Sequence, residues 1–97
     1  MAHPRHELDP AFLTPIRLSL MAALRDNEVE FGTLRDLVEA SDSAVSKGIA
    51  TLEEAGYVAT AKTHIRNRPR TLVRTTAKGR AAYARHLAAL RAIAGDR

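Results

Sequence analysis

Short polar and basic side chains recur at helical spacing in the middle of this 97-residue chain. In the segment 41–56, SDSAVSKGIATLEEAG, the positions Ser43, Ser46 and Lys47 fall opposite the apolar positions of a predicted helix. Hydroxyl and ammonium groups can form hydrogen bonds with base edges, and the methyl group of an alanine can contact a thymine methyl. This pattern has the chemistry needed to contact the major groove of DNA. The candidate residues are Ser41, Asp42, Ser43, Ser46, Lys47, Ala50 and Thr51.

Three arginines at alternate positions follow in the segment 64–70, HIRNRPR. A guanidinium group is always charged and can bind a phosphate through two hydrogen bonds. Proline and asparagine predict a loop here, between two short strands at 57–63 and 71–75. Because alternate side chains of an extended chain point the same way, we expect a basic wing that contacts a phosphate backbone, with His64 at its base. The candidate wing residues are His64, Arg66, Arg68 and Arg70.

The charge distribution favours a polyanionic partner over the alternative of an ordinary solvated surface. Residues 1–54 hold ten of the 11 acids and five Lys/Arg, whereas residues 55–97 hold ten Lys/Arg and a single acid. No acid lies between Glu54 and Asp96, so the wing and the last predicted helix present an almost purely positive surface. We therefore expect double-stranded DNA as the partner.

Several other classes of protein are disfavoured by what the sequence lacks. Without cysteine there is no disulfide, thiolate metal ligand or cysteine nucleophile. No nucleophile elbow, H-E-x-x-H or phosphate-binding loop occurs, so we expect neither enzymatic activity nor a cofactor. Histidines near the N-terminus lack a scaffold for a metal, and His86 lacks a ligand cluster, so we expect His86 to be a surface or interface residue. Without an apolar run of eighteen residues or a secretory signal core, we expect a cytoplasmic, DNA-associated protein with no membrane partner.

Capping residues and hydrophobic periodicity predict the elements that carry these side chains. Thr14 before Pro15 starts a helix, Ser41 caps another, Gly56 ends that helix, and Thr76 starts the last one. We expect helices at 15–25, 33–39, 42–55 and 77–94, and strands at 29–31, 57–63 and 71–75. Residues 1–10 are polar and contain two prolines, so we expect a flexible N-terminal arm.

The last predicted helix carries an apolar stripe that has few partners left within the chain, which favours packing against a second copy. Leu18 falls partly off the apolar stripe of the first helix and is a candidate for the same contact. The candidate dimer residues are Leu18, Tyr83, Leu87, Leu90 and Ile93.

Four stretches together resemble the short winged helix-turn-helix transcriptional regulators of the MarR/ArsR-like group, over about residues 12–92. They are SDSAVSK at 41–47, LEEAGYV at 52–58, RPRT at 68–71 and TAKGR at 76–80. The resemblance implies a mainly α fold with a small β-hairpin, built from a three-helix core, a two-stranded wing and a C-terminal dimerisation helix. It implies a DNA-binding domain at 11–76 after the arm at 1–10, and the dimerisation helix at 77–97. The recognition helix would enter the major groove, and the first and last helices would build a homodimer.

Two residues, Gly48 and Thr75, depart from what such a domain usually carries, and Asp42 is unusual at a DNA face. Asp42 would repel a phosphate, so we expect it to cap the helix or to accept a hydrogen bond from a cytosine amino group. Gly48 stands where the group has a larger residue, and we expect it to allow close approach of a neighbouring backbone. Thr75 stands where the group has an apolar residue, which puts the packing of that strand in question.

The function that the resemblance implies is sequence-specific binding of double-stranded DNA by a transcriptional regulator, a repressor that binds a near-palindromic operator as a homodimer. Two alternatives are a protein-interaction winged-helix module and a non-specific architectural DNA-binding protein. Members of the group respond to small ligands, and by analogy we expect an unidentified hydrophobic effector between the first and last helices.

Overall fold

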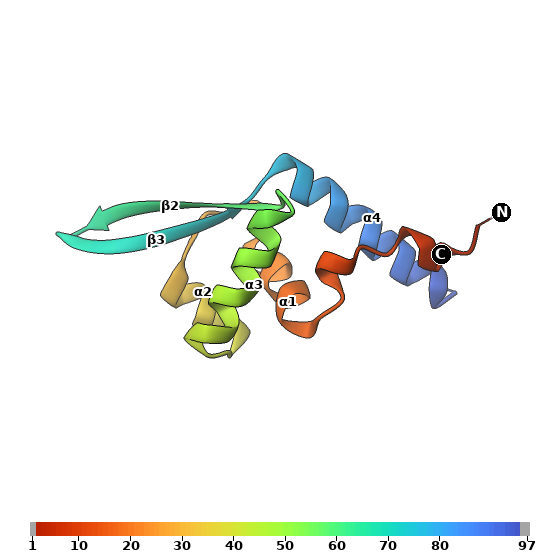
Figure 1. Ribbon diagram of the computed structural model, residues 1–97, viewed down its shortest axis with the longest axis horizontal. Coiled ribbons are helices and arrows are strands. Elements are labelled where there is room, and N and C mark those ends of the chain that lie inside the picture. The colour runs from red at the N-terminus through yellow and green to blue at the C-terminus, as the bar shows by residue number, and fades with distance from the viewer. Residues whose placement is uncertain (1, 96–97) are drawn as a thin grey trace.

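Helices and a three-stranded antiparallel sheet make up the computed structural model, which describes residues 2–95 (Figure 1). The long axis measures 55 Å against 24 and 21 Å for the others, because the β2–β3 ribbon and α4 extend from opposite ends of the helical core (Figure 1). The elements in order are η1 (Pro4–Glu7), η2 (Pro10–Phe12), α1 (Pro15–Leu24), β1 (Val29–Glu30), α2 (Phe31–Val38), α3 (Asp42–Glu54), β2 (Val58–Ile65), β3 (Arg68–Thr75) and α4 (Ala77–Ile93). This is the expected winged helix arrangement.

Each α-helix begins at a side chain that accepts a hydrogen bond from the backbone of its first turn. The hydroxyls of Thr14, Ser41 and Thr76 accept from the N–H three residues later, at 3.3, 3.1 and 2.9 Å, which confirms the predicted caps. The start of α2 was predicted two residues too late. The carboxylate of Glu30 accepts from the N–H of Thr33 at 3.3 Å, so a glutamate caps this helix and no serine or threonine marks it.

The core lies between α1, the inner face of α3 and the base of the sheet. Val45, Ile49 and Leu52 of α3 are buried, as the helical spacing predicts. Their main partners are Leu20, Met21, Leu24, Leu34, Val58 and Val73. Burying this inner face leaves the opposite face of α3 exposed to solvent.

Gly48 belongs to the inner face of α3 and faces α1. A Cβ built at this position would lie 2.8 Å from Cδ1 of Leu20 and 3.3 Å from Cγ2 of Ile16. The close neighbours are therefore side chains of α1, and the expected backbone contact is wrong. Because Gly48 is buried, it does not belong to the exposed face that carries the candidate recognition residues.

The wing is longer than predicted, because β2 and β3 pair from Val58↔Thr75 to Ile65↔Arg68 and leave only Arg66 and Asn67 as the turn. The expected seven-residue loop at 64–70 is wrong. Both turn residues have positive φ, 54° and 63°, which matches the twist of a two-residue hairpin although neither is glycine.

The strand β3 lies in the middle of the sheet, between β1 and β2. β1 pairs only with Leu72 and Val73, so Pro69 occupies a position where β3 has one neighbouring strand and a missing N–H is tolerated. Thr75 is buried, and its hydroxyl donates to the carbonyl oxygen of Arg25 at 2.6 Å. That bond satisfies the polar group in the place where an apolar residue is usual.

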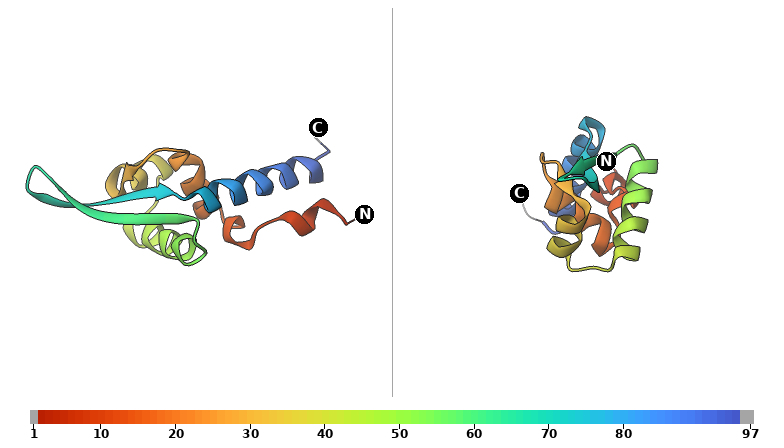
Figure 2. Two further views of the ribbon diagram at one scale, coloured as in Figure 1. Left: turned by 90° about the horizontal axis from the view of Figure 1, so that it is seen from above. Right: turned by 90° about the vertical axis from the view of Figure 1, so that its left-hand side faces the viewer.

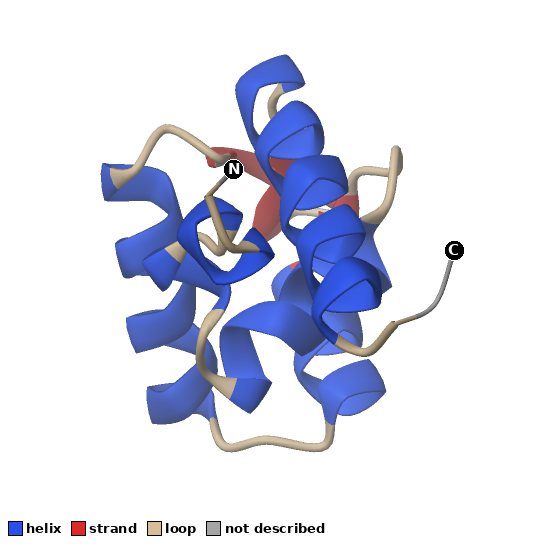
Figure 3. Ribbon diagram, turned by 90° about the vertical axis from the view of Figure 1, so that its right-hand side faces the viewer, coloured by secondary structure: helices blue, strands red, loops and turns tan. Residues whose placement is uncertain are grey.

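The N-terminal segment 4–12 runs along α4 and differs from the expected flexible arm (Figures 2 and 3). Phe12 is 1% exposed and lies 5.2 Å from the ring of Tyr57, 5.6 Å from Tyr83 and 5.3 Å from His86, measured between ring centroids. The N–H of Asp9 donates to Nδ1 of His86 at 3.0 Å, and the Asp9 carboxylate accepts from the hydroxyl of Tyr57. His86 is therefore buried under this segment and is not a surface residue.

The buried His86 makes the stability of the fold depend on pH. Burial lowers the pKa of His86, against a smaller opposing effect of the Asp9 carboxylate. Below the unfolded-state pKa of about 6.5, the unfolded chain binds a proton more readily than the folded chain. The stabilisation is therefore fully present above about pH 6.5 and is lost as the pH falls toward the lowered folded-state pKa.

Urea unfolding at about pH 7.5 and about pH 5.5 measures this effect, and we expect a lower free energy of unfolding at the acidic pH. A His86→Gln variant does not titrate at this position but keeps an oxygen that can accept from Asp9. Its loss of stability between the two pH values should be smaller than that of the wild type. An equal loss in both proteins would show that His86 is not the responsible group.

Candidate nucleic-acid interface

The outer face of α3 presents the polar and basic side chains that the sequence singles out. The positions Ser41, Asp42, Ser43, Ser46, Lys47, Ala50 and Thr51 are all exposed. They lie on the helix or at its N-terminal cap, opposite the buried Val45, Ile49 and Leu52. The helix is therefore free along its length to approach a partner, with small side chains that do not hinder entry into a groove.

Asp42 is neutralised by a neighbouring helix. The guanidinium of Arg35 in α2 donates to the Asp42 carboxylate at 2.8 Å and to that of Asp36 at 3.2 Å. The helix cap is Ser41, so the expected capping role of Asp42 is wrong. The ion pair explains how an acidic residue is accommodated at the N-terminus of this face.

The arginines of the wing divide into two groups. Arg66 and Arg68 are exposed at the tip, whereas Arg70 is half-buried and lies 3.9 Å from the carboxylate of Glu30. The N–H of Gly32 lowers the pKa of Glu30, as Arg70 also does to a lesser extent, so this carboxylate stays ionised. The almost purely positive surface expected for the wing is therefore wrong at Arg70.

His64 lies near the tip of the wing and not at its base. It pairs with Pro69, one position before the last pair of the ribbon, and its side chain is exposed. The prediction ended the first wing strand at residue 63, before His64, and therefore placed His64 at the base of the wing.

A shallow cleft of ≈ 260 Å³ lies between the exposed face of α3 and the sheet. Its lining includes Ser46, Ala50 and the acidic Glu53 from α3, and Thr60, Lys62 and Thr71 from the ribbon; the Thr60 hydroxyl donates to the Glu53 carboxylate at 2.9 Å. Lys62 was not among the predicted site residues. The sequence could have indicated Lys62, because it follows Thr60 at an alternate position and alternate residues of a strand share a face.

A second depression, of ≈ 640 Å³, lies at the wing tip and is lined by Ile65, Arg66, Arg68 and Arg70. Lys47 of α3 and Lys62 of β2 are further exposed cations, and Lys62 lies on the other face of the ribbon from Arg68, since it pairs with Thr71. The arrangement can contact base edges through α3 and phosphates through the wing at the same time.

The candidate dimer residues divide between the core and the surface. Tyr83 packs on Phe12, and Leu18 and Leu87 are half-buried. Leu90 and Ile93 are 36% and 43% exposed, and Leu13, which was not predicted, is 56% exposed. A groove of ≈ 380 Å³ between α1 and α4 is lined by Leu13, Pro15, Leu18 and Leu90, among others. The exposed apolar surface therefore extends over both α1 and α4.

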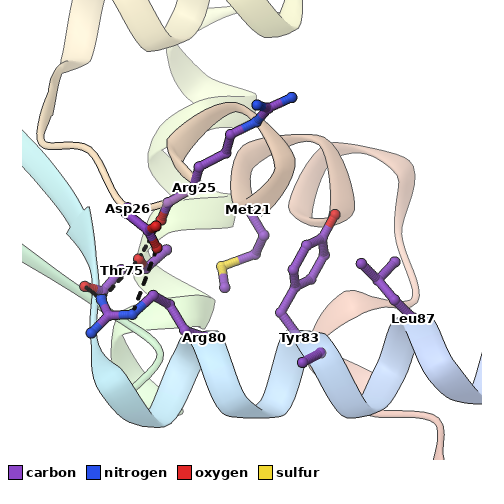
Figure 4. Close-up of a pocket in the computed structure, with 8 residues that line it drawn as sticks. Met21, Arg25, Asp26, Thr75, Arg80, Tyr83 and Leu87 are labelled. Atoms are coloured by element: carbon purple, nitrogen blue, oxygen red, sulfur yellow. Dashed lines mark hydrogen bonds and ion pairs between the residues drawn. The ribbon is translucent and has the colours of Figure 1, made fainter.

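A separate pocket of ≈ 220 Å³ lies between the end of α1 and the first half of α4 (Figure 4). Met21, Tyr83 and Leu87 supply apolar walls. At its edge, Arg80 donates to the carbonyl oxygen of Thr75 at 3.0 Å and lies 3.8 Å from the carboxylate of Asp26. The pocket is thus apolar within and charged at the rim.

Within residues 2–95, no cluster of three or more acidic or histidine side chains has the arrangement of a metal site. No helix in that range is both long enough and apolar enough to cross a membrane.

Comparison with known proteins gives a consistent result. The family model of the winged helix DNA-binding domain matches residues 16–94. An uncharacterized protein of Methanocaldococcus jannaschii is 31% identical over 77 residues, covering 78% of this chain and 84% of that protein. The structure of a transcriptional regulator homologue from Pyrococcus horikoshii OT3 superposes with a TM-score of 0.86 at 28% identity, covering 98% of this chain and 96% of the other. A MarR-family transcriptional regulator from Silicibacter pomeroyi superposes with a TM-score of 0.67 at 26% identity, covering 93% and 60%.

Proposed function

Because this chain belongs to the winged helix DNA-binding domain family, with MarR-family regulators among its structural neighbours, we propose that it is a sequence-specific transcriptional repressor that binds a near-palindromic operator as a homodimer. The observation that supports this most is the exposed polar face of α3 with Lys47, followed by a wing whose Lys62, Arg66 and Arg68 are also exposed. The proposed role is binding and not catalysis.

In this proposal α3 lies in the major groove and the wing follows the backbone beside it. Ser43, Ser46 and Lys47 contact base edges, and Ala50 and Thr51 offer methyl groups to thymine. Ser41 and the free N–H groups at the start of α3 hold a phosphate. Arg66 and Arg68 bind phosphates at the wing tip, with His64 next to them.

The proposed homodimer places two recognition helices about one helical turn of DNA apart, roughly 34–36 Å. Its contact is the apolar surface formed by Leu13, Leu18, Leu90 and Ile93. A symmetric protein of this kind requires a near-palindromic site, since each copy contacts an equivalent half-site.

Salt dependence and competition separate this proposal from its two alternatives. Affinity for duplex DNA should fall steeply between about 50 and about 200 mM salt, since each phosphate contact releases counterions. Equal affinity at both salt concentrations would favour a protein-interaction module. A palindrome selected from genomic fragments should compete far better than random duplex; equal competition would favour an architectural protein.

Arg68→Ala should weaken binding to the selected palindrome and to random duplex alike, by about tenfold, or about 1.4 kcal/mol. The reason is that a phosphate contact carries no sequence information. Fluorescence anisotropy titrations at several salt concentrations measure this, and the slope of log affinity against log salt should decrease by about one. Arg91→Ala, an exposed arginine in the last turn of α4, is the matched control. Unchanged binding by a folded Arg68→Ala protein would refute the role of the wing.

Leu90→Asp should convert the proposed dimer to a monomer, because a carboxylate would be buried in an apolar contact. Sedimentation measures the mass, and operator affinity should fall with loss of the second half-site. Leu37→Asp places the same charge on a leucine that is 60% exposed on α2 and should leave the mass unchanged. A Leu90→Asp protein that sediments as the wild type does would place the dimer contact elsewhere.

For the effector we propose a small hydrophobic molecule that binds in the pocket between α1 and α4 (Figure 4). Its apolar walls would hold such a molecule, and the pocket lies between the DNA-binding core and the helix that carries the dimer contact. Ala84→Trp would fill the space and should abolish any effect of a candidate ligand on DNA affinity. A retained effect would exclude this pocket.

A further inference from the structure

Ile65 is a large apolar side chain at the tip of a basic wing, and it is 47% exposed. It forms the last cross-strand pair with Arg68, directly before the Arg66–Asn67 turn. Single exposed apolar residues are common on protein surfaces and need no explanation by themselves. The position of this one among guanidinium groups, at the most distant point of the ribbon, is what calls for an explanation.

The ribbon projects well beyond the rest of the molecule (Figures 1 and 2). β1 reaches only Leu72 and Val73, so from Thr71 to the turn the two strands have no other strand beside them. The burial of these positions falls accordingly, and the residues from His64 to Pro69 are all exposed. The structure thus carries Ile65 away from the hydrophobic core, to which it does not belong.

Cross-strand geometry places Ile65 and the arginines on the same face. Directly paired residues of an antiparallel ribbon share a face, as do alternate residues of one strand. Ile65, Arg68 and Arg70 therefore point to one side, and with Arg66 they line the depression at the tip. An apolar group flanked by cations suits a surface that is negative at its edges and apolar between them.

The minor groove of DNA has phosphates along its rims, and a side chain that enters between two base pairs meets their apolar faces. Proteins that bind it insert isoleucine, leucine or proline between base steps and bend the duplex by about 20–90°. We propose that Ile65 acts as a wedge that partly unstacks one base step in the minor groove next to each α3 site, while Arg66 and Arg68 hold the flanking phosphates. This inference rests on the proposed function.

The wedge adds a second source of sequence selectivity. Pyrimidine–purine steps such as TA unstack more easily than A-tracts, so a wedge favours operators with a flexible step in the flanking minor groove. The protein would then discriminate at positions that α3 does not reach.

The experiment measures DNA bending and DNA binding separately on one duplex of about 30 bp. A duplex this much shorter than the persistence length is nearly straight when free, so a bend induced by the protein can be detected. The duplex carries the selected palindrome, a dye at each end for energy transfer, and 2-aminopurine at the flanking step. Wild type should raise both the energy transfer and the 2-aminopurine fluorescence on binding. It should also bind duplexes with flanking TA steps about fivefold more tightly than duplexes with flanking A-tracts.

Ile65→Ser should lose most of both signals and the preference for TA, while its affinity at low salt falls less than that of Arg68→Ala. Ile65→Leu, which keeps an apolar wedge, should retain both signals. Leu37→Ser is the control for removal of an exposed leucine far from the tip and should behave as wild type. Thermal unfolding should be unchanged in Ile65→Ser, since the side chain supports no core contact.

The outcomes distinguish the two proposals. Wild-type binding without a bend, or a bend that persists in Ile65→Ser, overturns the wedge and leaves the proposed function intact. Loss of all binding in both Ile65 variants also overturns it, because the residue would then serve affinity and not deformation. Absence of salt-dependent binding to any duplex by the wild type overturns the proposed function, and the wedge with it.

Discussion

Gly79→Ala should destabilise the protein by about 3 kcal/mol or more, which is beyond the usual cost of a small overpacking. A Cβ at this position would lie 2.0 Å from the carbonyl oxygen of Tyr57, a backbone atom that cannot turn aside as a side chain can. Urea unfolding followed by circular dichroism measures the loss. In the same protein, α4 should leave the wing at a changed angle or fail to dock.

The position matters because two hydrogen bonds join the start of α4 to the junction between α3 and β2 here. The N–H of Thr76 donates to the carbonyl oxygen of Tyr57 at 3.0 Å, and the Thr76 hydroxyl donates to that of Gly56 at 2.7 Å. Gly79 allows α4 to begin directly against this junction. The orientation of the proposed dimer helix relative to α3 is therefore set at Gly79.

Gly48→Ala is the matched control, since it also adds one methyl group to a buried helical glycine. Its nearest obstacle is the end of the Leu20 side chain at 2.8 Å, which can move. Alanine also gains up to about 1 kcal/mol in helix propensity, so we expect a net change within about 1 kcal/mol. Equal losses in the two variants would show that the backbone contact at Gly79 is not the cause.

Phe12→Ala should cost about 3–5 kcal/mol, as for other buried phenylalanines. Phe12 is 1% exposed and packs on Tyr57, Tyr83 and His86, so its removal leaves a cavity where the N-terminal segment, the α3–β2 junction and α4 meet. Urea unfolding measures the loss. Limited proteolysis should also cut the segment before residue 12 more rapidly, because the bond from Asp9 to His86 would no longer be supported.

Leu13→Ala tests whether the effect belongs to the buried ring. Leu13 is the next residue but is 56% exposed. Because it belongs to the proposed dimer contact, both truncations are compared in the Leu90→Asp background, where Leu13→Ala should change stability by only about 0.5 kcal/mol. If the Phe12→Ala and Leu13→Ala proteins were equally stable, the N-terminal segment would behave as the flexible arm that its composition suggests.

Local signals in the sequence were sufficient for most of the helices. A hydroxyl that caps the first turn, as at Thr14, Ser41 and Thr76, acts on a backbone group three residues away, so its effect is visible in a short window. The inner face of α3 follows from helical periodicity in the same way. Once that face is buried, Ser43, Ser46 and Lys47 must lie on the opposite, exposed face.

The wing shows where local signals end. Arg66 and Asn67 adopt the left-handed conformation, which asparagine tolerates, but no glycine marks the place of a two-residue turn there. The pairing of eight residues on each strand stabilises that turn, and the strands therefore extend through His64 and Arg68. The neutralisation of Arg70 by Glu30 likewise depends on β1 lying beside β3.

By itself the sequence determined the order of elements, the polar face of α3 and the basic character of the second half of the chain, because propensity, capping and charge act over a few residues. Only the tertiary structure decided that Asp9 meets His86, 77 positions along the chain, and that Arg70 of the wing meets Glu30 of β1. It also decided which glycine faces backbone and which faces a side chain. The physical reason is that these contacts are made by segments brought together by burial of a shared core, and no short window of sequence contains both partners.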